Sequence, residues 1–321
     1  MRTWGLLALY VGSQLTALLL AAPFLRLGLE TNANPSSVSN ILPFLVVIVV
    51  APLAIILFAR RAPNSLQVLR YVLLGAIAFA LIYTLYPAFS IVFPQSLTFE
   101  SGFALELSLP LALSVAAICF LTLWIEPQWY AVDLVGFLAA GSLTAILGIS
   151  LGILPVLLLL GALMVYDAVA VYGTKHMLSL ADVVSDLKLP ILMVVPEHRD
   201  FDYVRSSPLK EVRERVRSAP TEREATFMGL GDVIIPGVLV VSAYTYLPAS
   251  PTPLGIGANL VVALACIVGS LAGYAVLMRL VERGTAQAGL PFLNGGGIIA
   301  FVLAYVLLFH SLSLGIGGPL L

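Results

Sequence analysis

The stretch LLLLGALMVYDAVAVYG (157–173) decides how this chain is interpreted, because it places Asp167 inside a run that is otherwise apolar and long enough for a membrane helix. A second run, FMGLGDVIIPGVLVV (227–241), carries Asp232 close to its start. A carboxylate at the centre of a bilayer costs about 3 kcal/mol or more. Two such residues in separate runs therefore predict a shared functional site.

The composition identifies the class of protein. The chain has 321 residues, of which 60% are hydrophobic and 10% are charged. Soluble domains have roughly 45–50% apolar and about 25% charged residues. We therefore expect a multi-pass integral protein of the cell membrane. The net charge of −1 argues against a nucleic-acid partner.

Nine runs are long enough to cross a hydrocarbon core of about 30 Å as helices. The predicted fold is an all-α integral membrane protein with nine transmembrane helices. A proline at the start of the sixth run suits the first turn of a helix, where its missing N–H costs nothing. The runs cover residues 4–26, 40–60, 69–92, 103–125, 129–152, 154–177, 226–247, 256–282 and 290–313.

The basic residues predict the orientation. With a cytoplasmic N-terminus, all of the 16 Lys and Arg residues except Arg26 fall in segments on the inner side, as the positive-inside rule requires. An odd number of spans then places the C-terminus outside. Residues 1–22 also resemble a cleaved signal peptide, but we expect a retained first helix because the apolar run is longer than a usual signal core.

One polar stretch divides the chain into three parts. Residues 1–177 form an N-terminal part with six helices, residues 178–225 a cytoplasmic loop, and residues 226–321 a C-terminal part with three helices. The loop begins with an apolar piece, LPILMVVP (189–196), and then becomes highly charged.

The predicted topology places the two aspartates at one depth. Asp167 lies roughly 20 Å along the sixth span from its outer end, at 1.5 Å per residue. Asp232 lies near the inner start of the seventh span. Both therefore fall in the cytoplasmic third of the membrane. Neighbouring antiparallel helices with residues at the same depth can bring two carboxyl groups together.

Glycine and proline around Asp232 predict an open helix start. Gly229 and Gly231 let backbones approach closely. Pro236 removes the helical hydrogen bond to the carbonyl of Asp232. Tyr166 precedes Asp167, where its ring can line a pocket.

These motifs resemble those of a known protein family. Tyr-Asp at 166–167 and Gly-Leu-Gly-Asp at 229–232 match the YD and GxGD motifs of the presenilin and signal peptide peptidase family of intramembrane aspartyl proteases. That family also has nine spans and a long loop between the sixth and seventh. Its third motif, Pro-Ala-Leu, is matched only in part by Ala-Gly-Leu-Pro at 288–291. The chain is most similar to a microbial presenilin homologue.

The resemblance implies a site. Asp167 and Asp232 would be the catalytic pair, and no metal or cofactor is implied. Other residues would bind substrate or shape the site: Tyr166, Gly229, Leu230, Gly231, Ala288, Gly289, Leu290 and Pro291.

The expected reaction is hydrolysis of peptide bonds within transmembrane helices. Two close carboxyl groups share one proton, activate a water molecule and polarise the scissile carbonyl. A substrate helix must unwind first, and residues 189–196 are our candidate for a strand edge that receives the unwound piece. Accessory subunits are not implied.

Three alternatives remain at this point. A proton-coupled transporter also uses intramembrane carboxylates, a type IV prepilin peptidase also carries a GxGD motif, and a non-catalytic scaffold would keep the fold alone. No HExxH or GxSG pattern is present, so the sequence does not favour a zinc or serine intramembrane protease.

Overall fold

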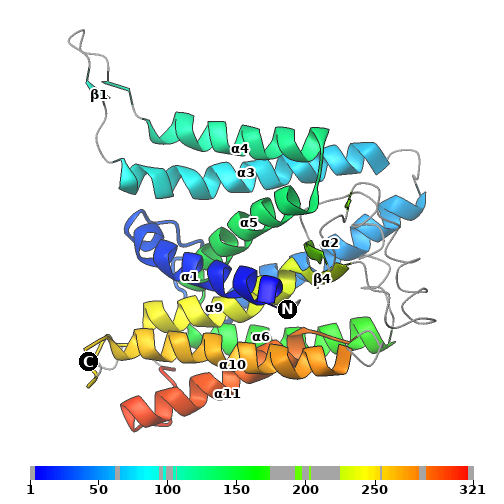
Figure 1. Cartoon of the computed structure of the whole chain (residues 1–321). Coiled ribbons are helices and arrows are strands. Elements are labelled where there is room, and N and C mark those ends of the chain that lie inside the picture. The colour runs from blue at the N-terminus through cyan, green and yellow to red at the C-terminus, as the bar shows by residue number, and fades with distance from the viewer. Residues whose placement is uncertain are drawn as a thin grey trace.

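The computed structural model of the chain describes residues 4–61, 66–93, 97–98, 104–105, 107–173, 192–196, 202–203, 225–253, 255–281 and 287–316. Within these ranges, nine long apolar helices pack side by side (Figure 1). Eight of them are long and apolar enough to cross a membrane, and the ninth, α9, has 17 residues. The helices are α1 (Trp4–Arg26), α2 (Ile41–Arg61), α3 (Leu66–Val92), α4 (Ser108–Ile125), α5 (Trp129–Ser150), α6 (Ile153–Ala168), α9 (Leu230–Tyr246), α10 (Ala258–Val281) and α11 (Leu290–Phe309).

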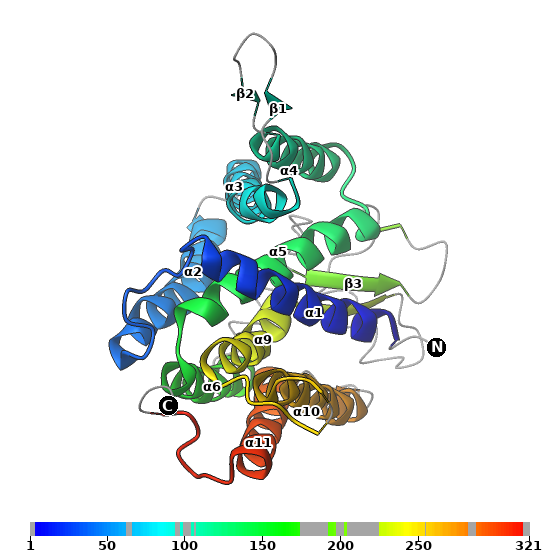
Figure 2. The same ribbon diagram turned by 90° about the vertical axis from the view of Figure 1, so that its left-hand side faces the viewer.

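Helix α9 lies at the centre of the molecule. It packs against α1, α5, α6, α10 and α11, and these helices surround it in the view of Figure 2. Every residue from Ile235 to Ala243 is buried. A helix that is apolar on all sides is buried in protein or in lipid, and α9 is enclosed by protein.

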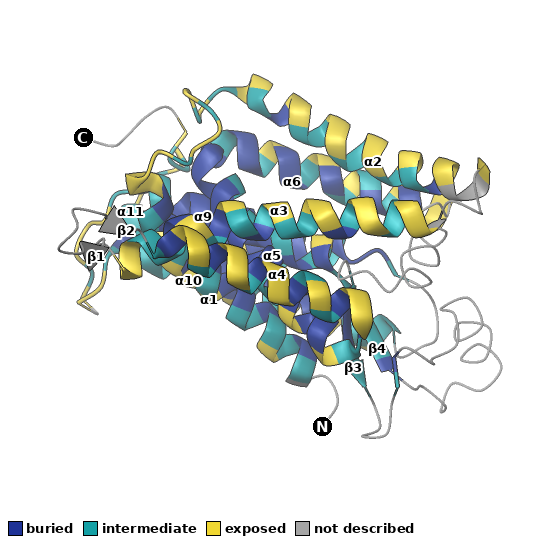
Figure 3. Cartoon of the chain, turned by 90° about the horizontal axis from the view of Figure 1, so that it is seen from above, coloured by how far each residue is buried: buried dark blue, intermediate teal, exposed yellow. Residues whose placement is uncertain are grey.

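The rim of the molecule is apolar and exposed. Helices α2, α3 and α4 carry long exposed stripes in Figure 3. Val47, Phe79 and Ile118 are 63%, 70% and 63% exposed, respectively. Large exposed apolar side chains on this scale indicate a surface that faces lipid.

Glycine allows α10 and α11 to pack closely. A Cβ atom on Gly273 would overlap the carbonyl group of Phe292, and one on Gly269 would overlap that of Gly296. Small residues at facing positions are the usual means by which membrane helices approach each other. This contact fixes the first turn of α11 against α10.

Two spans begin later than the sequence predicts. The fourth, expected from residue 103, begins as a helix at Ser108, two residues before Pro110, which suits the first turn. Ala104–Leu105 (β2) instead pairs with Leu97–Thr98 (β1).

The sequence predicts that the seventh span is a helix from residue 226. Ala225–Gly229 is instead a strand, β4, which pairs antiparallel with β3 (Leu192–Pro196), and α9 begins at Leu230. Thr226 and Phe227 are residues that favour strands, and Gly229 and Gly231 weaken a helix. With a partner strand available, the extended conformation is preferred.

Both faces of the β3–β4 sheet are buried. Val194 and Phe227 pack into a cluster with residues of α3, α4 and α5. Met193 and Met228 pack into a second cluster with residues of α1, α9 and α10. The sheet is therefore held between helices at the start of α9 rather than resting on a surface.

The sixth span, expected as 154–177, changes its winding after Asp167. Helix α6 ends at Ala168 and continues as a single π-turn over Val169–Gly173, labelled η3. Such π-turns occur frequently at functional sites. Residues 174–177 lie outside the described ranges.

Candidate active site

Asp167 lies in the last turn of α6 and is 7% exposed. Its Oδ2 atom accepts a hydrogen bond from the backbone N–H of Leu290 at 3.0 Å. Leu290 is the first residue of α11, so the carboxyl group occupies the N-terminus of that helix. The positive end of a helix dipole stabilises an acidic group in this position.

The first turn of α11 explains why one acceptor is sufficient. Pro291 has no N–H group, and the N–H groups of Phe292 and Leu293 both donate to the carbonyl of Gly289 at 3.2 Å. The N–H groups of Gly289 and Leu290 need an acceptor from elsewhere. The carboxyl group of Asp167 supplies it to both, so the donors at this helix start are all used.

Asp232 lies in the first turn of α9, three residues after β4 ends. Its carboxyl group packs against the backbone of Gly289. A Cβ atom at position 289 would lie 2.9 Å from Oδ1 and 3.0 Å from Oδ2 of Asp232. Position 289 therefore has no room for a side chain while the carboxylate keeps this place.

The two carboxyl groups thus contact adjacent residues of one segment, Asp167 at Leu290 and Asp232 at Gly289. They are close enough for the charge of Asp167 to act on Asp232. Two acidic groups that interact in this way titrate as a pair when their coupling is strong.

The remaining residues of the sequence motifs lie around this pair. Gly229 touches Asp232, since a Cβ atom there would lie 3.4 Å from Oδ2. Gly231 is exposed and has open space beside its Cα. Leu230 and Ala288 are buried, and Tyr166 packs at the edge of the main core cluster.

Tyr172, in the π-turn, connects the end of α6 to the segment before α11. Its hydroxyl donates to Oε1 of Gln287 at 2.7 Å and accepts from the N–H of Ala288 at 3.2 Å. Its role depends on the π-turn, which brings residue 172 toward residues 287 and 288 and has no visible signal in the sequence.

Helix α1 supports Asp232 from the side. The buried side chain of Gln14 donates from Nε2 to the carbonyl of Val233 at 2.7 Å. Tyr10, one turn earlier, is buried near enough to interact electrostatically with Asp232. A polar face of the first span therefore packs behind the start of α9.

The strand edges near Asp232 are not equivalent. Asp133 of α5 is 5% exposed, and its Oδ1 atom accepts the N–H of Val194 at 2.7 Å. The free edge of β3, our candidate for receiving substrate within 189–196, is therefore closed at its centre. A position near the start of the fifth apolar run predicts that Asp133 lies at the membrane interface, but the structure buries this side chain. Residues 189–191 lie outside the described ranges.

Three other side chains of reactive types lie in the part of the chain that the structure describes. His310 caps the far end of α11 in the left-handed conformation, with φ 48°. Cys119 and Cys266 are buried free thiols. Among the residues that the structure describes, no three His, Cys, Asp or Glu side chains are grouped so as to hold a metal ion.

A family sequence model covers almost the whole chain. The model described as signal-peptide peptidase, presenilin aspartyl protease matches residues 7–310. The chain belongs to this family. It is an intramembrane aspartyl protease and a multi-pass membrane protein that acts on membrane proteins.

Two solved structures of presenilin-family intramembrane aspartate proteases are similar to this member of the family. One, in space group C222, has 28% sequence identity and a TM-score of 0.65 and covers 96% of this chain and 100% of its own. The other, in space group P2, has 29% identity and a TM-score of 0.60 and covers 94% and 97%, respectively. No curated protein sequence matches the chain.

At residues 288–291 the chain departs from the Pro-Ala-Leu motif of its family. In this presenilin-family protease, Gly289 stands where the motif has Ala, and the carboxyl group of Asp232 occupies the space that a methyl group would need. Leu290 and Pro291, which match the presenilin pattern, form the helix start that binds Asp167.

Proposed function

We propose that Asp167 and Asp232 are the catalytic pair of this protease and that they hydrolyse peptide bonds in transmembrane helices. The observation that carries the proposal is their joint contact with Gly289–Leu290. That segment contacts both the end of α6 and the start of α9.

The chemistry follows from one proton shared between two carboxyl groups. The ionised carboxylate takes a proton from a water molecule, and the water oxygen attacks the scissile carbonyl carbon. The protonated carboxyl group gives its proton to the carbonyl oxygen, which forms a tetrahedral gem-diol. Collapse breaks the C–N bond, the nitrogen takes up a proton, and an amine and a carboxylic acid leave. No covalent bond forms between enzyme and substrate.

The substrate must be extended to react. Amide groups in a membrane helix are closed in hydrogen bonds, so a segment has to unwind and needs new partners for its N–H and C=O groups. A strand added to a sheet edge supplies these partners.

We propose β4 as the edge that receives the unwound segment. Because the N–H of Val194 points away from β4 to Asp133, residues 194 and 227 form a pair without hydrogen bonds between them. The alternation along an antiparallel ladder then directs the backbone groups of Ala225, Phe227 and Gly229 outward. A segment paired along this edge runs toward Asp232, which follows Gly229 by three residues.

The test of the catalytic pair uses purified enzyme in lipid nanodiscs with a single-span reporter substrate. Asp167→Asn and Asp232→Asn should each lower the cleavage rate by at least about 10²-fold, the contribution of general acid–base catalysis. Asn at 167 retains an oxygen for the N–H of Leu290, so the melting temperature should stay close to that of the wild type. Either variant retaining full activity would refute the assignment.

An independent test uses binding instead of turnover. A peptide isostere with a hydroxyl group at the scissile position mimics the gem-diol, and it should bind the wild-type enzyme tightly. Both Asn variants should bind it at least tenfold more weakly. Equal binding by wild type and variants would show that the carboxyl groups do not face the reacting carbon.

A further inference from the structure

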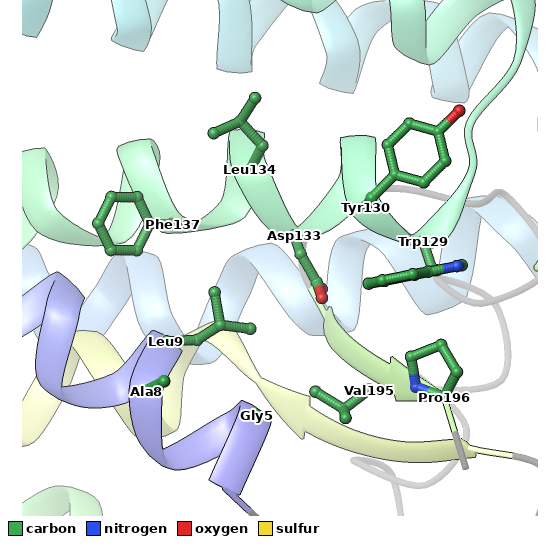
Figure 4. A pocket seen from close by; sticks show the side chains of 10 residues that line it. All are labelled: Gly5, Ala8, Leu9, Trp129, Tyr130, Asp133, Leu134, Phe137, Val195 and Pro196. Carbon is green, nitrogen blue, oxygen red and sulfur yellow. The ribbon is translucent and has the colours of Figure 1, made fainter. Parts of the chain in front are cut away.

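Asp133 is a third acidic side chain inside the membrane-spanning helices, and the reaction does not use it. It lies in the second turn of α5, with its carboxyl group directed at β3 (Figure 4). A buried carboxyl group costs free energy in a membrane protein and is kept where it has a function. Its described hydrogen bond is the one from the N–H of Val194.

This hydrogen bond closes one edge of the β3–β4 sheet. The outward-facing positions of β3 are 192, 194 and 196. Asp133 covers the N–H at 194, and Pro196 has no N–H to offer. Proline on an edge strand and a helix that covers the edge are two devices by which proteins block strand addition.

The outward positions of β4 are Ala225, Phe227 and Gly229, and none of them is proline. The N–H of Gly229 hydrogen-bonds to the carboxyl group of Asp232, whereas Ala225 and Phe227 direct an N–H outward. Two strands of the same short sheet therefore present one blocked edge and one edge that can form hydrogen bonds.

A cavity beside β3 gives an extended segment a route to the edge that Asp133 closes. A space of about 770 Å³ lies beside β3, between the first turns of α1 and α5. Its lining is almost entirely apolar and includes Leu9, Phe137 and Val195 along with Asp133 (Figure 4). An apolar extended segment that entered this cavity would meet the edge of β3, on the far side of the sheet from the free edge of β4.

We propose that Asp133 is a positioning residue for substrate: its carboxyl group closes the free edge of β3, so that an unwound substrate segment pairs only with β4 and reaches Asp232 in a single register. This inference rests on the proposed strand addition and names the residue that decides between the two edges.

The first experiment separates hydrogen bonding from charge. Asp133→Asn keeps an oxygen that accepts the N–H of Val194, and Asp133→Ala removes it. Hydrogen exchange followed by mass spectrometry should show the Val194 amide protected in wild type and Asp133→Asn, and fast-exchanging in Asp133→Ala. Protection of α9 should be the same in all three proteins, which shows that the fold is retained.

The second experiment follows substrate cleavage. Asp133→Ala should lower kcat and the apparent KM for a single-span reporter together, by several-fold, because substrate paired at the opened β3 edge is bound unproductively. It should also add product termini shifted from the wild-type position. Asp133→Asn should keep the wild-type product pattern and a KM within about twofold of the wild-type value. An unchanged KM and product pattern in Asp133→Ala would overturn the proposal.

A double variant distinguishes edge closure from general support of the fold. Val194→Pro removes the outward N–H without touching the ladder to β4, so Asp133→Ala/Val194→Pro has a closed edge and no carboxylate. It should recover the wild-type product pattern. Failure to recover, with the exchange of α9 still slow, would also overturn the proposal.

The two proposals fail separately. If Asp133→Ala behaves as wild type while Asp167→Asn is inactive, only the role of Asp133 is lost. If Asp167→Asn remains active, the catalytic assignment is lost whatever Asp133 does.

Discussion

The carboxyl group of Asp232 lies against the Cα of Gly289, close enough that a methyl group there would come within 3.0 Å of both oxygens. This contact joins the starts of α9 and α11. The position of the Asp232 carboxyl group therefore depends on the size of residue 289.

Gly289→Ala should therefore displace Asp232 and lower kcat. Overpacking of a tight contact costs about 1–3 kcal/mol, and we expect at least a tenfold loss of cleavage of the reporter in nanodiscs. Gly295→Ala, on the same helix, is the matched control, because its new methyl group would meet only Met164 at 3.7 Å. Equal activities of the two variants would contradict the geometry.

Tyr172→Phe should weaken the connection between the π-turn and the segment before α11. It removes a hydroxyl that takes part in two hydrogen bonds and keeps the ring. Each bond contributes about 1 kcal/mol, so we expect a several-fold fall in kcat, measured with the same reporter. Tyr83→Phe, at an exposed tyrosine of α3, should have no effect. A Tyr172→Phe enzyme as active as this control would exclude a role for the hydroxyl.

Gly273→Ala should destabilise the whole protein. Its methyl group would overlap the carbonyl of Phe292, which belongs to the backbone and cannot rotate away. We expect a loss of about 2 kcal/mol or more, observed as a lower midpoint of thermal unfolding in detergent. Gly75→Ala has open space around it and should leave the midpoint unchanged or slightly higher.

Phe227→Pro tests β4 as the receiving edge. Proline there removes an outward N–H and leaves the ladder to β3 intact, so the KM for substrate should rise by about tenfold while thermal stability matches that of Phe227→Ala. Thr226→Pro removes an N–H that faces β3 and should lower stability as well. Normal KM in Phe227→Pro would show that substrate does not pair at this edge.

Much of the fold could be predicted from the sequence, because apolar runs long enough for a bilayer have few alternatives. The nine runs and the nine helices agree within a few residues at most ends. The motifs around Asp167 and Asp232 identified the family for the same reason: acidic residues in such runs are rare. The cytoplasmic N-terminus, the outer C-terminus and the division into three parts remain predictions.

The details of the site depend on contacts between distant segments. Residues 225–229 are apolar enough for a helix, and only pairing with β3 makes them a strand. The sequence alone suggests that Asp133 is an interfacial residue. Its burial depends on the hydrogen bond from the N–H of Val194, which is 61 positions further along the chain. The space taken by Asp232 at Gly289 belongs to the packing of α9 on α11, and no local pattern encodes it.

The length of α9 has a physical consequence for substrate access. At 1.5 Å per residue, its 17 residues extend about 25 Å, a few ångströms less than a hydrocarbon layer of about 30 Å. Lipid imposes no penalty for this mismatch, since neighbouring helices shield α9 from acyl chains. At the N-terminal end of α9, the remaining few ångströms are occupied by the extended backbone of β4 and the carboxyl group of Asp232. We expect these polar groups to admit water below the level of the headgroups, so that a target protein can be cut without first being drawn out of the bilayer.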